Sequence, residues 1–320
     1  MKALILAGGF ATRLWPLSEN RAKPLLLVGG KTILEHLLEK IPKEMPVYLL
    51  INKKFEADFI QELEQLGRKN AEIFLEDAMS DSGKVGALKA LSEAIKHYEI
   101  DDNIAVFAGD NLLPNFKMSQ LIDDSQSASL VVHDCKDLYA AKKFGVVEIR
   151  EIGGKWIIAD FEEKPQNPKG TLVSTSFMSL GKKFFPNLHD LAEKYPDRLG
   201  EIIAELIRQK KTVWASLNSG DWFDVGSFES YLEAHKSISE KPVSKVFLEK
   251  NHLSGKVFIG EGSVVENCRL TDCIIYPNNT LKNCHISQSA LDESCILEGV
   301  DLNNKIIRKG TNLINKTNGK

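Results

Sequence analysis

Two adjacent glycines and two basic residues near the start of the chain could form a binding site for phosphate groups. The first 27 residues read MKALILAGGFATRLWPLSENRAKPLLL, so Gly8 and Gly9 directly follow a short apolar run. Glycine lacks a Cβ atom, which permits positive φ and lets several backbone N–H groups converge on an anion. Arg13 adds a planar guanidinium that matches phosphate oxygens, and Lys23 adds a point charge. The combination predicts a phosphate-binding loop, whereas an isolated Gly-Gly is more often only a tight turn.

Three further stretches carry charged residues directly after apolar runs. Asp110 follows the run IAVFAG, and Asp224 lies in the run WFDVG. Between them stands FEEKP, in which Glu163 precedes Lys164. A single carboxylate after a strand is often a helix cap, and a Glu-Lys pair often decorates a solvated surface. Two carboxylates from separate strands, however, suit Mg²⁺, which prefers one or two carboxylates together with substrate phosphates.

The order of these four stretches resembles one enzyme family. The run LAGGxxTRLxPL followed by KPLL, then the acidic residue after a central strand, then EEKP, then WxDVG is similar to the pattern of sugar-1-phosphate nucleotidyltransferases, over residues 1 to about 235. The resemblance implies that a sugar phosphate oxygen attacks the α-phosphate of a nucleoside triphosphate in line and gives a nucleotide sugar and pyrophosphate. Catalysis would then come from positioning and charge neutralisation, without a protein nucleophile.

The resemblance also implies a role for each charged residue. Arg13 would bind the leaving phosphates, Lys23 the phosphates of the nucleotide, and Lys164 the phosphate of the sugar. Asp110 and Asp224 would hold Mg²⁺, the one cofactor implied, which would screen the phosphates. The implied catalytic residues are therefore Arg13, Lys23, Asp110 and Lys164.

The residues that line the two substrates follow from the same resemblance. The nucleotide site would comprise Leu6, Ala7, Gly8, Gly9, Thr12, Arg13, Lys23 and Gly86, the last of these within the stretch DSGKVGAL at 81–88. The sugar phosphate would contact Gly145, Glu163 and Lys164, and the Glu163 carboxylate can accept two hydroxyl hydrogen bonds. Several relatives have a glutamine that reads a pyrimidine where this chain has Gly86, so the choice of base stays open.

Two departures from the family pattern bear on the substrate. Ala11 stands where the family usually has a third glycine, and the run STSFMS at 174–179 replaces a T-G-I-Y-like strand that normally lines the sugar pocket. Neither departure removes a charged residue, so we expect the chemistry to be kept while the sugar stays open. We favour glucose 1-phosphate with dTTP or UTP, and mannose-1-phosphate guanylyltransferase is the close alternative.

Alternating strands and helices must position these residues. Apolar patterns predict strands at 3–6, 47–51, 73–76 and 104–108, and helices at 32–40, 55–66 and 86–97. Such alternation predicts an α/β fold with a Rossmann-like mixed, mostly parallel sheet flanked by helices, and with ligands at the carboxyl ends of the strands. Residues 146–150 and 156–162, which flank Gly153 and Gly154, predict a hairpin laid against this sheet.

The last part of the chain repeats with a period of sixteen residues. Three apolar columns recur: Ile259, Ile275, Leu291 and Ile307; Val265, Leu281, Leu297 and Leu313; and Leu270, Ile286 and Leu302. Such columns predict a solenoid of short stacked strands and resemble the short left-handed parallel β-helix of hexapeptide-repeat proteins. Cys268 and Cys284 are equivalent within the repeat and are expected to be stacked core thiols. The predicted domains are a nucleotidyltransferase domain at 1–237, a linker at 238–256 and the β-helix at 257–320.

Composition excludes several classes of protein. The 41 basic and 44 acidic residues give a net charge of -3, which argues against a nucleic-acid-binding footprint. An apolar run of about 20 residues, as a membrane span requires, is missing, and Met1 leads straight into a strand. Five cysteines without C-x-x-C spacing favour a reducing compartment. We therefore expect a cytoplasmic protein with small-molecule substrates and no partner nucleic acid or membrane.

Two other classes of function compete with the nucleotidyltransferase. Some regulatory subunits of translation-initiation exchange factors resemble the same two-part layout without turnover, but a scaffold has no need for all five of Arg13, Lys23, Asp110, Lys164 and Asp224. Acyl transfer by the solenoid would need more coils than the three full ones predicted. We expect the solenoid instead to associate copies of the chain into a homo-oligomer, because a short stack leaves edges and an apolar end that a second copy could cover.

Overall fold

The computed structural model describes residues 1–76, 83, 85–125, 127–239 and 248–315. The chain divides into two compact units that do not follow chain order. The first, here called the sheet unit, contains Met1–Phe10 and Leu37–Asp224. The second, the coil unit, contains Ala11–His36 and Val225–Lys320. The loop that carries Arg13 and Lys23 therefore packs as part of the same unit as the C-terminal repeat.

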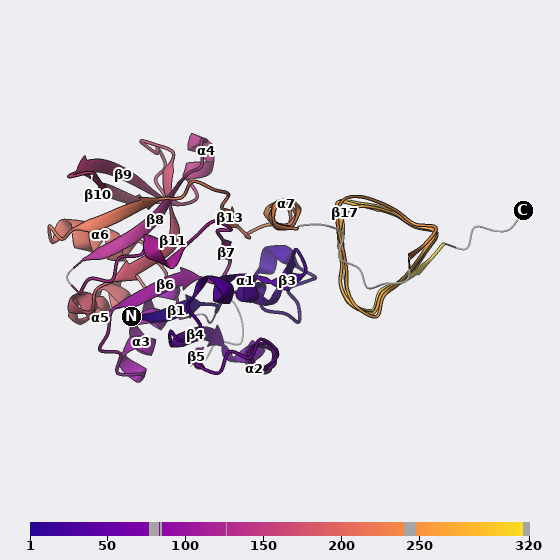
Figure 1. The fold of residues 1–320 in the computed structure, drawn as a ribbon, viewed down its shortest axis with the longest axis horizontal. Coiled ribbons are helices and arrows are strands. Elements are labelled where there is room, and N and C mark those ends of the chain that lie inside the picture. Colours follow the sequence, from indigo (N-terminus) through magenta and orange to yellow (C-terminus); the bar gives the residue numbers. More distant parts are fainter. Residues whose placement is uncertain (77–82, 84, 126, 240–247, 316–320) are drawn as a thin grey trace, which may run out of the picture. The chain divides into compact units, whose positions relative to one another are not determined.

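A nine-stranded sheet forms the centre of the sheet unit, with the order β5-β4-β1-β6-β11-β8-β12-β10-β9 (Figure 1). Its strands are β1 (Lys2–Leu6), β4 (Val47–Asn52), β5 (Ala71–Glu76), β6 (Ile104–Ala108), β8 (Ala128–Asp134), β9 (Gly145–Ile152), β10 (Lys155–Glu163), β11 (Leu172–Leu180) and β12 (Val213–Leu217). β1 lies between β4 and β6, and these neighbours are parallel to it. The carboxyl end of β1, from which the glycine loop leaves, thus lies inside the sheet rather than at its margin.

The sheet is mixed, but it is less parallel than the sequence predicts. The four strands from β5 to β6 are all parallel to one another. Beyond β6, four of the five neighbouring pairs along the described sheet are antiparallel, and only β8 and β12 are parallel. The difference has a simple cause: the second half of the sheet contains the predicted hairpin, β9 and β10, and β11 runs back between β6 and β8.

The helices are α1 (Ile33–Lys40), α2 (Glu56–Gln65), α3 (Ala87–His97), α4 (Leu138–Ala141), α5 (Phe185–Lys194), α6 (Glu201–Arg208) and α7 (Phe228–Ile238). Three of them, α3, α5 and α6, bury one apolar face in a common core with the sheet. In α3, Leu88, Leu91 and Ile95 recur at three- and four-residue intervals, which places them on one side of the helix. The predicted strand and helix alternation through α3 is confirmed, with ends that differ by a few residues.

Two short ladders lie outside the large sheet. β2 (Leu27–Val28) pairs with β3 (Lys31–Thr32), and β7 (Asn111–Leu112) pairs with β13 (Phe223–Asp224). The predicted hairpin between β9 and β10 is confirmed, and both of its turn glycines, Gly153 and Gly154, have positive φ. None of the helices among the described residues is long and apolar enough to cross a membrane.

The C-terminal repeat forms a stack of parallel strands, here called the coil stack, that appears triangular in outline in Figure 1. Its strands are β14 (Leu248–Glu249), β15 (His252–Ile259), β16 (Val264–Glu266), β17 (Arg269–Ile275), β18 (Thr280–Lys282), β19 (His285–Ser287), β20 (Ala290–Leu291), β21 (Ile296–Glu298), β22 (Asp301–Asn303), β23 (Ile306–Ile307) and β24 (Asn312–Ile314). The three predicted apolar columns are confirmed, because each member is the ladder partner of the residue sixteen positions on. Of the linker predicted at 238–256, residues 240–247 lie outside the described residues.

Left-handed residues turn each corner of the coil stack. One corner is made by Gly262, Asn278, Ser294 and Gly310, a second by Asn267, Asn283 and Gly299, and a third by Asp272, Gln288 and Asn304, all with positive φ. Asparagine, glycine and aspartate tolerate this conformation best, which explains the polar residues between the apolar columns. The interior holds Cys268 and Cys284, buried as free thiols, and the Cys284 N–H lies 3.4 Å from the Cys268 sulfur. The predicted stacked core thiols are confirmed.

Candidate active site

The glycine loop after β1 is shaped by close approach rather than by positive φ. A Cβ atom on Gly8 would lie 2.5 Å from a carboxylate oxygen of Glu76, at the end of β5, so a larger residue would displace that buried carboxylate. The Asn52 side-chain amide donates to the Gly8 carbonyl at 3.0 Å, and the other amide atom, Oδ1, is buried without a hydrogen-bond partner in the described part of the chain. Gly9 is open, because a methyl group added there would meet nothing within 4 Å. The loop therefore brings bare backbone to the edge where β1, β4 and β5 end.

The left-handed residue of this loop is Ala11 and not one of the glycines. Its φ is 51° and its ψ is 38°, whereas neither Gly8 nor Gly9 has positive φ. The Ala11 carbonyl accepts hydrogen bonds from the Leu14 N–H and the Ser18 hydroxyl, each at 2.8 Å, within the coil unit. The position where the family usually has a third glycine is thus the position that requires a left-handed backbone.

The two predicted metal-binding carboxylates are brought together by the β7–β13 ladder. Asp224 pairs with Asn111, which directly follows Asp110. Asn111 is buried, its amide donates to Asp110 at 2.7 Å, and its carbonyl oxygen accepts from the indole N–H of Trp222 at 2.6 Å. Asn111 therefore orients the Asp110 carboxylate, and the ladder places the backbone of Asp224 beside Asn111.

This donor set fits a magnesium ion. Asp224 in the ladder and Asp110 directly before it provide carboxylate oxygens, the hard ligands that Mg²⁺ prefers. Within the described ranges, no cluster of three or more His, Cys, Asp or Glu side chains forms a self-sufficient metal site. The remaining ligands would have to be water and substrate phosphate oxygens, as is usual for Mg²⁺.

A second cluster surrounds Glu163 at the end of β10. Glu163 pairs with Gly145 across the hairpin, and a Cβ atom on Gly145 would lie 2.4 Å from the Phe161 ring and 3.2 Å from the Glu163 carboxylate. A Cβ atom on Gly200, which precedes α6, would lie 2.3 Å from the same carboxylate. Burial raises the pKa of Glu163 above its ordinary value, against the opposing effect of the Lys164 ammonium. The two glycines therefore let the Glu163 carboxylate and the Phe161 ring pack directly against backbone.

Lys164 directly follows this carboxylate and is held by its backbone. Its φ is 47°, its N–H donates to the Phe144 carbonyl at 3.1 Å, and its ammonium lies 3.9 Å from a Glu163 oxygen. The side chain is largely exposed, with 66% of its surface accessible. The left-handed backbone thus directs the lysine out of the hairpin beside Glu163, where an anion could reach it.

Trp222 links the two clusters. Its ring packs against Phe144 at a centroid distance of 4.7 Å and against His133 at 5.5 Å, while its indole N–H donates to Asn111. Phe144 in turn precedes Gly145. Trp222 stands inside the quoted run WFDVG and Asn111 directly follows Asp110, but the sequence alone assigns neither a role, because only the fold shows that one contacts the other.

The run STSFMS forms a bulge in β11. The ladder with β8 slips between Ser174 and Met178, and Ser176 has a φ of 61°. Thr175 is fully buried, and its hydroxyl donates to the Val131 carbonyl at 2.8 Å. This departure from the family pattern therefore changes the local backbone of a strand beside β9.

Gly86 is required by packing at the start of α3. Its φ is 101°, and a Cβ atom there would lie 2.5 Å from the Pro196 carbonyl oxygen. That oxygen accepts from the Leu88 and Lys89 N–H groups, and Asp197 accepts from Ala87, so these backbone donors are already engaged. Of the neighbouring stretch predicted to hold the base, residues 81, 82 and 84 lie outside the described residues.

Thr12, Arg13 and Lys23 belong to the coil unit. Arg13 lies in a 3₁₀ turn, Thr12–Leu14, and is exposed. Lys23 begins a second 3₁₀ turn, Lys23–Leu25, and is buried, with 7% of its surface accessible. The remaining predicted residues, Leu6, Ala7, Gly8, Gly9, Gly86, Asp110, Gly145, Glu163, Lys164 and Asp224, belong to the sheet unit.

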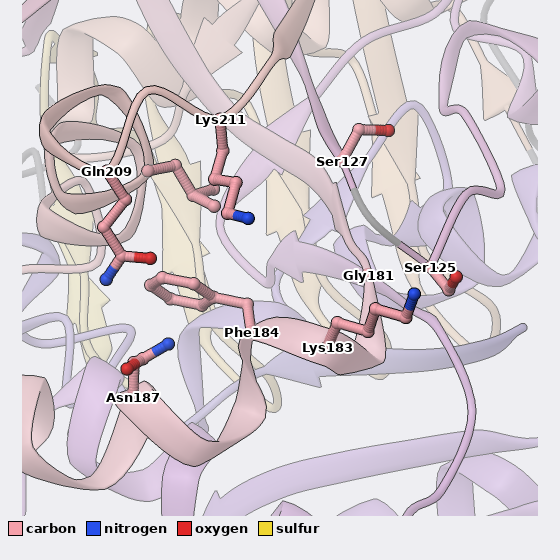
Figure 2. Close-up of a pocket in the computed structure, with 9 residues that line it drawn as sticks. Ser125, Ser127, Gly181, Lys183, Phe184, Asn187, Gln209 and Lys211 are labelled. Carbon is pink, nitrogen blue, oxygen red and sulfur yellow. The ribbon is translucent and has the colours of Figure 1, made fainter.

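A hollow of about 200 Å³ in the sheet unit contains none of these residues. It is lined by Ser125, Ser127, Gly181, Lys183, Phe184, Asn187, Leu206, Gln209 and Lys211, and Figure 2 shows the Phe184 ring between Asn187 and Gln209. Lys183 and Lys211 are both exposed. We therefore assign the candidate site to the motif residues and not to this hollow.

Comparisons with known proteins place this arrangement among nucleotidyltransferases. Bifunctional protein GlmU of Methanocaldococcus jannaschii is 30% identical and aligns with 82% of this chain but 61% of its own length, so the chain spans about three fifths of that relative. Glucose-1-phosphate thymidylyltransferase of Streptomyces griseus is 24% identical over 98% of this chain and 88% of its own. Probable mannose-1-phosphate guanylyltransferase 2 of Arabidopsis thaliana is 25% identical over 98% of this chain and 83% of its own.

A solved structure and a family model complete the comparison. The crystal structure from Bacillus anthracis of a candidate glucose-1-phosphate thymidylyltransferase, in complex with a sucrose, has a TM-score of 0.62 and 22% identity, and the match covers 77% of this chain and 98% of that one. This likeness shows a shared fold. The family model described as nucleotidyl transferase matches residues 2–241, which is most of the chain. The chain therefore belongs to the nucleotidyl transferase family.

Proposed function

We propose that the protein is a sugar-1-phosphate nucleotidyltransferase that forms a nucleotide sugar and pyrophosphate. The observation that carries this proposal is the chain of contacts through Trp222 and Asn111. These contacts connect the pair of Asp110 and Asp224 with the cluster formed by Phe144, Gly145, Glu163 and Lys164, within the sheet unit. An acidic pair suited to a metal and a carboxylate-lysine cluster suited to a sugar phosphate are what a transfer between phosphates requires.

The residues divide the work of an in-line displacement. Lys164 binds the phosphate of the sugar, and Glu163 accepts hydrogen bonds from sugar hydroxyls beside Gly145. Arg13 and Lys23 bind the triphosphate and stabilise the charge that develops on the leaving pyrophosphate. Asp110 and Asp224 would hold Mg²⁺, which when bound screens the phosphates from one another. Leu6, Ala7, Gly8, Gly9, Thr12 and Gly86 form the nucleotide side of the site in this proposal.

Glucose 1-phosphate with dTTP or UTP is our favoured pair. The support is the alignment with a Streptomyces griseus glucose-1-phosphate thymidylyltransferase over nearly the whole chain. Mannose 1-phosphate with GTP is the alternative, supported by the comparable alignment with the Arabidopsis thaliana protein. A regulatory subunit without turnover is disfavoured, because the acidic pair, its orienting asparagine and the lysine cluster are all retained.

The proposal extends to the rest of the molecule. We infer a left-handed parallel β-helix for the coil stack, since the three left-handed corners per coil and the sixteen-residue register are compatible with it. We also infer a cytoplasmic enzyme that associates through the coil stack, and we keep 1–237, 238–256 and 257–320 as proposed functional domains.

The test is pyrophosphate release with Mg²⁺, for each of four nucleoside triphosphates against glucose, mannose, galactose and N-acetylglucosamine 1-phosphates. We expect turnover with one pair, and a loss of at least 100-fold in kcat for Asp110→Asn, because the variant keeps the shape of the side chain and removes its charge. Gly170→Ala is the control, because a methyl group added at Gly170 would meet no other atom within 4 Å. Absence of turnover for every pair, from protein shown to be folded, would favour the regulatory subunit.

A further inference from the structure

Arg21 connects the loop that carries Arg13 and Lys23 to the coil stack. It lies between Arg13 and Lys23, and its guanidinium contacts Asp292 at 3.1 Å and Glu293 at 2.5 Å, at the far end of the chain. The same group lies over the Tyr276 ring at 4.4 Å. Only 16% of the side chain is accessible. A largely buried guanidinium with two carboxylates and an aromatic face is a rigid attachment, unlike an exposed ion pair.

The charge of Arg21 is matched by these neighbours. Burial by itself would lower the pKa of Arg21, but Tyr276, Asp292 and Glu293 raise it above the ordinary value. The pKa of Glu293 is lowered in spite of burial, because Lys309 and Arg21 both donate to it. The pairing between Arg21 and Glu293 is therefore charged at both ends near neutral pH.

Two buried tyrosines hold the loop a second time, at Leu27. The Leu27 N–H donates to the Tyr276 hydroxyl at 3.0 Å, and the Tyr231 hydroxyl donates to the Leu27 carbonyl at 2.7 Å. The two hydroxyls are 3.0 Å apart. Since Tyr231 has given its single hydrogen to Leu27, Tyr276 is the donor between them. Both backbone groups of Leu27 are thus fixed by side chains from α7 and from the coil stack.

Lys23 lies between these two attachments. Only five residues separate Arg21 from Leu27, so fixing both ends confines the backbone of Lys23 to a small volume. Ala22 and Leu26, on either side, are fully buried. An outer ion pair between Glu19 and Arg308 also joins the two segments, but it is more exposed and should contribute less.

We propose that Arg21 and Tyr276 are positioning residues through which the coil stack holds the nucleotide-binding loop ready for the triphosphate. The proposal rests on the proposed function, because it assigns Arg13 and Lys23 to the triphosphate. On this view the coil stack is part of the nucleotide site's support rather than only a means of association. Loss of the attachment lets Lys23 move, so triphosphate binding suffers while the sugar-phosphate cluster around Glu163 is unaffected.

The test compares Arg21→Gln, Arg21→Lys and Tyr276→Phe with Lys309→Gln in the full-length chain. Lys309 donates to the other oxygen of Glu293 at 2.7 Å but does not hold the loop, so its substitution controls for charge. We expect Arg21→Gln to raise the KM for the nucleoside triphosphate at least tenfold, with less than a threefold change for the sugar 1-phosphate. Arg21→Lys and Tyr276→Phe should raise the KM for the nucleoside triphosphate by an intermediate factor. Lys309→Gln should leave this KM within twofold of the wild-type value.

Hydrogen exchange of the backbone amides at 11–27 is measured on the same variants without substrate. We expect faster exchange there in Arg21→Gln and Tyr276→Phe, with the amides of β1 and β10 unchanged. Equal increases in both KM values, or unchanged exchange at 11–27, would overturn the proposal. A second outcome is exchange that rises as expected in a protein that turns over no substrate pair. That result would support the attachment of the loop but contradict the proposed nucleotidyltransferase activity. Should Arg21→Gln fail to fold, Tyr276→Phe, which loses only one oxygen, decides the question.

Discussion

Position 145 requires a glycine because two neighbouring side chains lie close to it, and not because its backbone has a positive φ. Its φ is not positive, but its Cα faces the Phe161 ring and the Glu163 carboxylate so closely that a methyl group would overlap them. The same is true of Gly200 on the other side. Two residues without side chains therefore define the shape of the space beside Glu163.

Gly145→Ala should impair use of the sugar 1-phosphate. The added methyl would force Phe161 and Glu163 to move, and overpacking of this kind costs about 1–3 kcal/mol. We expect kcat/KM for the sugar 1-phosphate to fall about 10- to 100-fold, which corresponds to that energy, and the KM for the nucleoside triphosphate to change little.

Steady-state kinetics on both substrates and urea unfolding check this prediction. Gly170→Ala is the matched control, because a methyl group there meets nothing within 4 Å and should leave both measurements unchanged. A Gly145→Ala enzyme with the wild-type KM for sugar 1-phosphate would show that Glu163 does not contact the sugar.

The motif residues could be predicted from the sequence, but their connections could not. Asp110 and Asp224 stand out because each follows apolar residues, and Lys164 stands out because it follows two glutamates and precedes a proline. Nothing local indicates that Trp222 donates to Asn111, since a tryptophan between polar residues is equally suited to a surface or a core. The left-handed residue at 11 was also not predictable, because alanine is ordinarily a poor choice for that conformation.

At the scale of elements, α7 contacts the N-terminal loop through a buried histidine. His235 has no accessible surface, and its Nδ1 accepts from the Gly29 N–H at 3.2 Å. Burial lowers the pKa of His235 from 6.5 to about 4, and the nearby charges of Lys256, Asp272 and Lys236 have smaller effects. The imidazole is therefore neutral in the folded protein near pH 6.

Stability should fall as the pH is lowered from about 6.5 towards 4. In this window the unfolded chain binds a proton at His235 that the folded protein does not, so acid favours unfolding. The stabilisation is fully present above pH 6.5, and its loss amounts to on the order of 3 kcal/mol at 1.36 kcal/mol per pH unit.

Urea unfolding at pH 7.5, 6 and 5 measures this dependence. His235→Gln removes the titrating group, so the slope between pH 6.5 and 5 should flatten by nearly one proton. Wild-type and His235→Gln slopes that coincide would assign the pH dependence to other groups.

The elements themselves were predicted unevenly. The sixteen-residue period determines the columns of the coil stack because parallel strands in register place equivalent residues on one another. The order of the strands beyond β6 could not be predicted, since β11 carries no local sign that it will pair antiparallel with β6 and β8. A short apolar run predicts that a strand forms, but it does not predict which other strand it pairs with.

At the scale of the whole molecule, the last coil among the described residues exposes apolar side chains. Leu313 and Ile314 in β24 have 42% and 47% of their surface accessible. If the chain associates through the coil stack, this end is where a second copy would gain most by covering it.

Sedimentation of a variant with Leu313→Ser and Ile314→Ser tests that association. We expect the wild-type chain to sediment as an oligomer and the variant to shift towards the monomer, with circular dichroism unchanged. The same substitutions at exposed apolar residues of the sheet unit, Leu138 and Tyr139, provide the control. An unchanged oligomer in the β24 variant would place the interface elsewhere.

The attachment of Arg21 to Asp292 also sets the order in which the protein can be made. The two residues are 271 positions apart, so at 5–20 residues per second the ribosome delivers the partner on the order of tens of seconds after Arg21. During that interval the Arg21 guanidinium has neither Asp292 nor Glu293 to pair with. The attachment can therefore form only after residue 292 has been made, so a segment synthesised early waits for one synthesised much later.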